Sequence, residues 1–173
     1  FDIIPETHPH LCYDDHNERF RGALRNIAGF ADGFLCDSRH VEGELQQYLA
    51  RIGAPTPPTA VVMFGWDFVA PAGDGNTLQR LGVTDGKYIL QVGTLEPRKN
   101  HIMVVRALHA LYSRLGDRLP VTVFAGKIGW KTETLLNELT AINYLGGRIR
   151  LLHCATHADL AALYRNCRFS VFP

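Results

Sequence analysis

Two adjacent cations, Arg98 and Lys99, stand in a loop whose residue types suit the binding of an anion. The loop covers residues 93–100 and separates an apolar, strand-like run from a segment with helical periodicity. Gly93 permits a close approach of the backbone to a ligand, and the free amides at the start of the following helix favour negative charge. Arg98 and Lys99 add charge-assisted hydrogen bonds. We therefore predict a phosphate site here. The alternative is a solvated Arg-Lys pair, which the placement between strand and helix disfavours.

Two common phosphate-binding motifs are absent from the chain. No segment has the G-x-x-x-x-G-K-[ST] spacing of a P-loop, and none has the G-x-G-x-x-G spacing of a dinucleotide site. The predicted phosphate site therefore belongs to neither a P-loop NTPase nor a nicotinamide or flavin enzyme.

Strands and helices alternate regularly from Lys87 onward. Strands are predicted over residues 88–92, 121–125, 149–152 and 169–172, and helices over residues 102–115, 132–145 and 157–166. This alternation predicts the α/β class, with a Rossmann-like parallel sheet and helices on both faces. Ligands bind outside the carboxyl ends of such strands. The rule selects the loops at residues 93–100, 126–131 and 153–156.

The first part of the chain has a less regular pattern. Pro5 and Pro9 interrupt the stretch from Phe1 to Arg19, which is predicted to be a loop. Short strands are predicted at residues 33–36 and 60–63, with a helix between them that Ser38 caps. On the last helix, Tyr164 is predicted to face the core.

Composition and charge exclude several classes of protein. Hydrophobic residues make up 46% and charged residues 20%, a balance typical of a chain that buries a core. The net charge of +1 gives no support for a nucleic-acid partner. No apolar run approaches the ~20 residues of a membrane span. The four cysteines are widely spaced, which favours the reducing cytoplasm over a disulfide framework.

A metal site is the alternative for the first loop. His8, His10, Cys12 and His16 lie close in the sequence, but their spacing matches no common structural zinc pattern. We therefore predict no metal site.

Several segments resemble the retaining GT-B-fold glycosyltransferases of the "group 1" family, of the mannosyltransferase-like, bacterial polysaccharide type. The most specific is Glu96-Pro97-Arg98-Lys99-Asn100, within residues 88–101. The likeness continues through residues 123–130, 149–153, 159–164 and 169–173, and upstream through residues 2–5, His8-Pro9 and residues 31–38. It spans almost the whole chain and is weakest between Phe68 and Gly86.

The resemblance implies a role for each matching position. Lys99 matches the lysine that contacts the donor diphosphate, and Arg98 lies beside it, so both are implied as catalytic residues that stabilise the leaving diphosphate. Gly93 matches the glycine that admits the phosphates, whereas Thr94 stands where many relatives carry an arginine. The other positions implied in donor binding are Gly126, Lys127, His153, Cys154, Ala155 and Thr156. The acceptor-side loop would contribute His8 and His10.

The same resemblance implies an incomplete GT-B architecture. Residues 1–67 correspond to the end of the N-terminal acceptor domain, residues 68–86 to a hinge, and residues 87–173 to the first part of the C-terminal nucleotide-sugar-binding domain. An acidic motif that holds the donor follows a Phe-Pro like Phe172-Pro173 in the family. We therefore expect the chain by itself to bind a nucleotide weakly and to be inactive.

The implied activity of the whole enzyme is transfer of a sugar from a nucleotide-diphosphate donor to a glycan or lipid-linked acceptor, with retention of configuration and without a metal or other cofactor. Such an enzyme would be cytoplasmic and compatible with peripheral association at the inner face of the membrane. Two alternatives stay open: a non-catalytic nucleotide-sugar-binding relative and a GT-B-type sugar-nucleotide epimerase.

Overall fold

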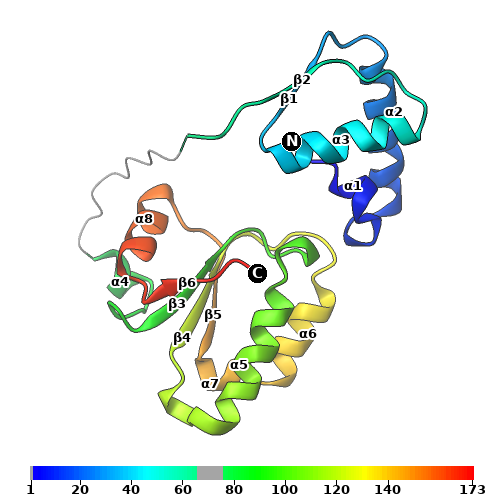
Figure 1. The fold of residues 1–173 in the computed structure, drawn as a ribbon. Helices are drawn as coiled ribbons and strands as arrows, with labels where there is room; N and C mark the ends of the chain where they lie inside the picture. Colours follow the sequence, from blue (N-terminus) through cyan, green and yellow to red (C-terminus); the bar gives the residue numbers. More distant parts are fainter. Residues whose placement is uncertain (1, 66–75) are drawn as a thin grey trace. The chain divides into compact units, whose positions relative to one another are not determined.

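The chain divides into two compact units, Phe1–Phe68 and Val69–Pro173. The computed structural model describes residues 2–65 and 76–173. Each unit contains parallel strands and helices, so each is of the α/β class (Figure 1). The first part of the hinge predicted over residues 68–86 lies outside the described residues. None of the four cysteines forms a disulfide.

In the described residues of the first unit, helices pack around a two-stranded parallel sheet. The elements of this unit are α1 (Ile4–Thr7), a 3₁₀ turn (Pro9–Leu11), α2 (Asp14–Ala28), β1 (Phe34–Cys36), α3 (Arg39–Arg51) and β2 (Thr59–Val61). Helix α3 packs against the strands, and α1 packs against α2. The core is formed by Leu24 of α2, Cys36 of β1 and Leu45 of α3 among others. The predicted cap of α3 is confirmed, because the Val41 backbone N–H donates to Ser38 Oγ at 3.2 Å.

The prediction of a loop from Phe1 to Arg19 is wrong. Pro5 and Pro9 both lie in the first turn of a helical segment, where a missing N–H costs nothing because that position has no intrahelical partner. Helix α2 then begins at Asp14, and the carboxylates of Asp14 and Asp15 suit the positive end of the helix dipole. Proline interrupts a helix when it lies in the interior, but here each of the two prolines lies at the start of a helical segment.

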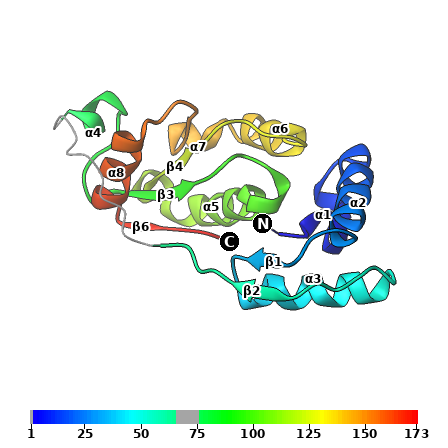
Figure 2. The same cartoon turned by 90° about the horizontal axis from the view of Figure 1, so that it is seen from above.

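The second unit has a four-stranded parallel sheet in the order β5-β4-β3-β6. The strands are β3 (Tyr88–Val92), β4 (Val121–Ala125), β5 (Ile149–Leu152) and β6 (Phe169–Ser170). Figure 2 shows β3 between β4 and β6. All four predicted strands are confirmed, with β6 ending two residues earlier than the pattern predicted. Parallel strands bring the loops that follow them to one edge.

Helices cover both faces of this sheet, as predicted (Figure 1). One face packs against α5 (His101–Leu115), α6 (Glu133–Ala141) and α7 (Tyr144–Gly147), and the other against α4 (Thr77–Arg80) and α8 (His157–Asn166). Because successive side chains of β3 point to opposite faces of the sheet, Ile89 lies on the first face, and Tyr88 and Leu90 lie on the second. The Tyr88 hydroxyl donates to the Leu163 carbonyl at 2.6 Å, which ties α8 to the sheet.

Two helical predictions in this unit need correction. The helix predicted over residues 132–145 ends at Ala141, because Asn143, Tyr144 and Leu145 take positive φ before the Gly146-Gly147 pair. Tyr164 was predicted to face the core but is 50% exposed, and its neighbour Leu163 is buried instead.

The described end of the predicted hinge, residues 76–86, packs within the second unit. Leu78, Leu81 and Val83 contribute to the core on the α8 face. The Gly86 N–H donates to the Asn166 carbonyl at 2.8 Å. This segment therefore supports α8 and, through it, the loop that precedes α8.

We expect Asp159→Asn to destabilise the second unit. Thr156 and Asp159 form a reciprocal cap at the start of α8, and Arg80 pairs with the Asp159 carboxylate. The bond from the Thr156 backbone N–H, with Arg80, holds the pKa of Asp159 below its ordinary value of 3.8. Loss of such a cap costs about 1 kcal/mol. Urea denaturation near neutral pH measures this loss, with Glu133→Gln in the first turn of α6 as the matched control.

The pH dependence gives a second readout of the same variant. A depressed folded pKa contributes stability above the ordinary value, and this contribution is lost as pH falls through the folded pKa. The difference between wild type and Asp159→Asn should therefore shrink in strong acid. A difference that is constant with pH would contradict a charge-dependent cap.

Candidate functional site

The loops after β3 and β4 are joined by backbone hydrogen bonds at the carboxyl edge of the sheet. Gly93 N–H donates to the Ala125 carbonyl at 3.0 Å, and Leu95 N–H donates to the Lys127 carbonyl at 2.8 Å. Gly129 N–H returns a bond to the Leu95 carbonyl at 2.9 Å. The two predicted ligand loops therefore form one rigid surface, in which Lys127 takes part through its backbone while its side chain is exposed.

Two glycines make this junction sterically possible. A Cβ on Gly126 would overlap the carbonyl group of Gly93, so any larger residue would push the two loops apart. Gly93 itself has φ +151°, a conformation that side chains disfavour. Both were predicted in donor binding, and the structure brings them into direct backbone contact.

The loop after β5 adjoins the same surface. Gly126 N–H donates to the Leu152 carbonyl at 2.9 Å, and His153 Nδ1 lies 3.3 Å from the Gly126 carbonyl oxygen. Cys154 is exposed, and Ala155 is half-buried. Thr156 is the N-cap of α8, and its hydroxyl and backbone N–H are both bonded within that cap. Of this loop, His153 is the side chain that reaches the neighbouring loop.

Lys99 lies in the loop at the carboxyl end of the inner strand β3. Its side-chain carbons are 3.8 Å from the position that a Cβ of Gly93 would occupy. Its ammonium nitrogen is 4.6 Å from the ring centroid of Phe172, just beyond β6. Such a cation–π contact contributes about 0.5–1 kcal/mol at an exposed site. The buried Gln91 side chain donates to the Lys99 carbonyl at 2.9 Å and fixes the 3₁₀ turn Pro97–Lys99.

Arg98 has a partner that the sequence did not reveal. Its Nη2 lies 2.6 Å from Oε1 of Glu96, whose side chain is only 2% exposed. A buried carboxylate needs such a counter-charge, because burial without one is strongly unfavourable. The sequence showed Glu96 only as a motif residue, and nothing in its type or spacing indicated burial. Arg98 and Lys99 therefore stand in different electrostatic settings.

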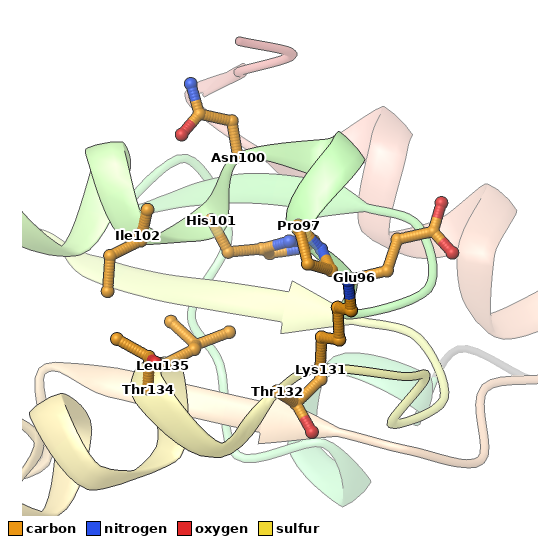
Figure 3. Close-up of a pocket in the computed structure, with 9 residues that line it drawn as sticks. All are labelled: Glu96, Pro97, Asn100, His101, Ile102, Lys131, Thr132, Thr134 and Leu135. Carbon is orange, nitrogen blue, oxygen red and sulfur yellow. The ribbon is translucent and has the colours of Figure 1, made fainter. Parts of the chain in front are cut away.

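A pocket of 290 Å³ lies behind this loop, between the starts of α5 and α6. Its lining consists of Glu96, Pro97, Asn100, His101, Ile102, Lys131, Thr132, Thr134 and Leu135 (Figure 3). In this view the Glu96 carboxylate extends away from the His101 ring. The lining mixes apolar side chains with hydroxyl, amide and ammonium groups.

His101 is one of the buried polar residues of this pocket, together with Glu96 and Thr132. It is 1% exposed, neither ring nitrogen has a hydrogen-bond partner among the described residues, and its ring meets Phe124 edge-on at 5.1 Å. Burial, reinforced by the charge of Lys99, lowers its pKa from 6.5 to about 4. Sequence reasoning missed His101. The helical spacing that it shares with Val105 and Leu108 could have placed it on the inward face.

His8 and His10 lie in the first unit and are both exposed. Their rings meet edge-on at 6.2 Å, and His8 Nδ1 lies 2.9 Å from Thr7 Oγ1. Within residues 2–65 and 76–173, no three His, Cys, Asp or Glu side chains gather in a way that could hold a metal ion. No helix in the described parts of the chain is both long and apolar enough to span a bilayer.

No protein-family model matches the chain. The chain is 27% identical over 181 residues to the serotype-specific mannosyltransferase WbdA of Escherichia coli, a match that covers 99% of this chain and 22% of WbdA. It therefore spans less than a quarter of the length of the relatives that it matches.

Solved structures match the fold of the chain. Anabaena Alr3699/HepE in complex with UDP and glucose matches with a TM-score of 0.68 at 20% identity, over 99% of this chain and 44% of that one. The UDP-forming trehalose-phosphate synthase of Burkholderia vietnamiensis matches with a TM-score of 0.67 at 16% identity, over 87% and 41%. The chain shares the fold of the GT-B glycosyltransferase structures. This likeness agrees with the α/β fold predicted from the sequence.

We expect acid to destabilise the wild type more than His101→Leu. Because the folded pKa of His101 is about 4 and the ordinary value is 6.5, the unfolded chain binds the proton first. The wild type therefore keeps its full stability above about pH 6.5 and loses up to ~3 kcal/mol as pH falls to about 4.

Urea denaturation at a series of pH values measures this difference. The control is His109→Leu, an exposed histidine on the same helix. Stability curves for wild type and His101→Leu that run parallel across this range would contradict a buried neutral imidazole.

Proposed function

We propose that this chain is the part of a glycosyltransferase that holds the diphosphate of a nucleotide-sugar donor at the carboxyl edge of the second unit. Residues 87–173, with residues 76–86 that pack against them, would belong to the nucleotide-sugar-binding domain, and residues 1–67 to the acceptor domain. The hinge would then be limited to the first part of the span predicted over residues 68–86. The observation that carries the proposal is the position of Lys99 against Gly93, where the loops after β3 and β4 meet.

Three properties of that position support diphosphate binding. The Lys99 ammonium contacts an aromatic face, Phe172, but pairs with no carboxylate among the described residues, so its charge can act on an anion. Gly93 has no side chain to block the approach of phosphate oxygens. Helix α5 begins two residues after Lys99, and its first amides favour negative charge.

Arg98 would act in a different way from Lys99. Its ion pair with the buried Glu96 keeps the loop folded and leaves a third of its side chain exposed. We propose that Arg98 supports the leaving diphosphate from the same loop, while Lys99 makes the closest charge contact. Thr94 takes the place of the arginine that many relatives carry, so Lys99 would bear more of the electrostatic stabilisation.

The remaining loops would border the nucleotide. Gly126, Lys127, His153, Cys154, Ala155 and Thr156 are proposed at the base and ribose. His8 and His10 are proposed on the acceptor side.

The proposed reaction of the whole enzyme is transfer of a hexose to a glycan or lipid-linked acceptor with retention of configuration. WbdA is a mannosyltransferase and HepE holds UDP and glucose, so both GDP-mannose and UDP-glucose are suitable donors to test. The cations and the helix terminus would take the place of a metal.

We expect a nucleoside diphosphate to bind this chain and Lys99→Ala to weaken it at least about tenfold, or ~1.4 kcal/mol. Calorimetric titration with UDP, GDP and ADP, and with UDP-glucose and GDP-mannose, measures the affinity and identifies the base. Arg114→Ala is the matched control, because it removes an exposed cation from the far end of α5.

The affinity should be unchanged when EDTA replaces added magnesium. A nucleotide that binds wild type and Lys99→Ala equally would contradict the proposed diphosphate contact. Absence of binding by every nucleotide to the folded chain would contradict the donor-site proposal itself.

A further inference from the structure

A second pocket of the second unit is surrounded by cations. Its volume is 350 Å³, within the range of about 300–1,000 Å³ that small-molecule sites occupy. It lies at the amino ends of β3, β4, β5 and β6, at the opposite end of the sheet from the loops of the proposed donor site. Five cationic side chains line it: Lys87, Arg118, Arg148, Arg150 and Arg168.

Little negative charge balances this group. Asp117 is the carboxylate among the lining residues, and it lies 3.1 Å from Arg148 with 91% of its side chain exposed. Among the described residues, the other four cations form no ion pair. Asp85 stands nearby in the sequence but is exposed and does not line the pocket. The whole chain has a net charge of only +1, so positive charge is concentrated here.

The fold brings these cations together over buried residues of the second unit. Tyr88 and Leu119 form a floor in which both side chains are almost fully buried. The Arg150 guanidinium lies directly over Gly82. A Cβ placed on Gly82 would lie 2.9 Å from Nη1 of Arg150. Each strand start contributes at least one cation, and parallel strands bring those starts together. Like charges repel when the pocket holds no anion, and a bound anion would relieve that repulsion.

We propose that this pocket binds a phosphate group, borne either by an anionic lipid headgroup or by a free phosphate compound. Arginine guanidinium groups bind phosphate oxygens in bidentate geometry, and four of the five cations are arginines. The inference does not depend on the proposed donor site, which uses other residues at the other end of the sheet.

The first test is titration of the ¹⁵N-labelled chain with inorganic pyrophosphate, followed by amide NMR. Shifts are expected at Val83, Lys87 and Leu119, separate from any shifts at Gly93 and Gly126 that report the donor site. The variant Lys87→Glu with Arg168→Glu reverses two exposed charges and should weaken the amino-end binding at least about tenfold. The variant Arg25→Glu with Arg39→Glu makes the same change of net charge on the first unit and should not.

The second test separates the two sources of phosphate. The chain is sedimented with vesicles of phosphatidylglycerol and, in parallel, of phosphatidylcholine. Binding to the anionic vesicles alone, lost in Lys87→Glu with Arg168→Glu, supports a lipid headgroup. Pyrophosphate binding at the amino end without vesicle binding supports a free phosphate compound. Absence of both, or equal loss in the two double variants, would overturn the proposal.

Discussion

The backbone of Gly126 lies so close to the backbone of Gly93 that the loops after β3 and β4 cannot shift independently. The hydrogen bonds of Gly93, Leu95 and Gly129 reinforce this contact and fix the direction in which the first loop leaves the sheet. The position of Lys99 follows from that direction, because its side chain lies along Gly93. The two loops can approach this closely only because Gly126 lacks a side chain and Gly93 takes a φ of +151°.

Buried polar groups beneath the loop complete the arrangement. The Gln91 amide holds the Lys99 carbonyl, and the Glu96 carboxylate holds the Arg98 guanidinium. Burying such groups is favourable only when partners satisfy them, so each restricts the loop to few conformations. The Gln91 amide oxygen has no partner in the described structure, although its nitrogen does. His101 differs, because neither of its ring nitrogens has a hydrogen-bond partner there, and the ring stays neutral at ordinary pH. At the amino end of the sheet, cations gather without comparable buried carboxylates.

The sequence predicted the sheet of the second unit because continuously apolar strands that alternate with periodic helices are compatible with few other folds. It also placed Lys99 at the carboxyl edge of that sheet, since the end of a parallel strand fixes where the next loop lies. It did not distinguish Arg98 from Lys99, because a cation at a helix start looks the same whether it faces a phosphate or a buried carboxylate. The prediction of a loop around Pro5 and Pro9 was wrong for a similar reason. Proline occurs at helix starts as well as after helix ends, and the local sequence alone does not distinguish the two.

The most direct test of a glycine-dependent site is nucleotide titration of Gly126→Ala. The added methyl must displace the Gly93 carbonyl, so the affinity for UDP or GDP should fall at least about tenfold while circular dichroism still shows a folded chain. Gly43→Ala on α3 is the matched control, because a Cβ there meets nothing within 4 Å. A folded Gly126→Ala that binds the nucleotide as tightly as the wild type would contradict the claim that this backbone contact builds the site.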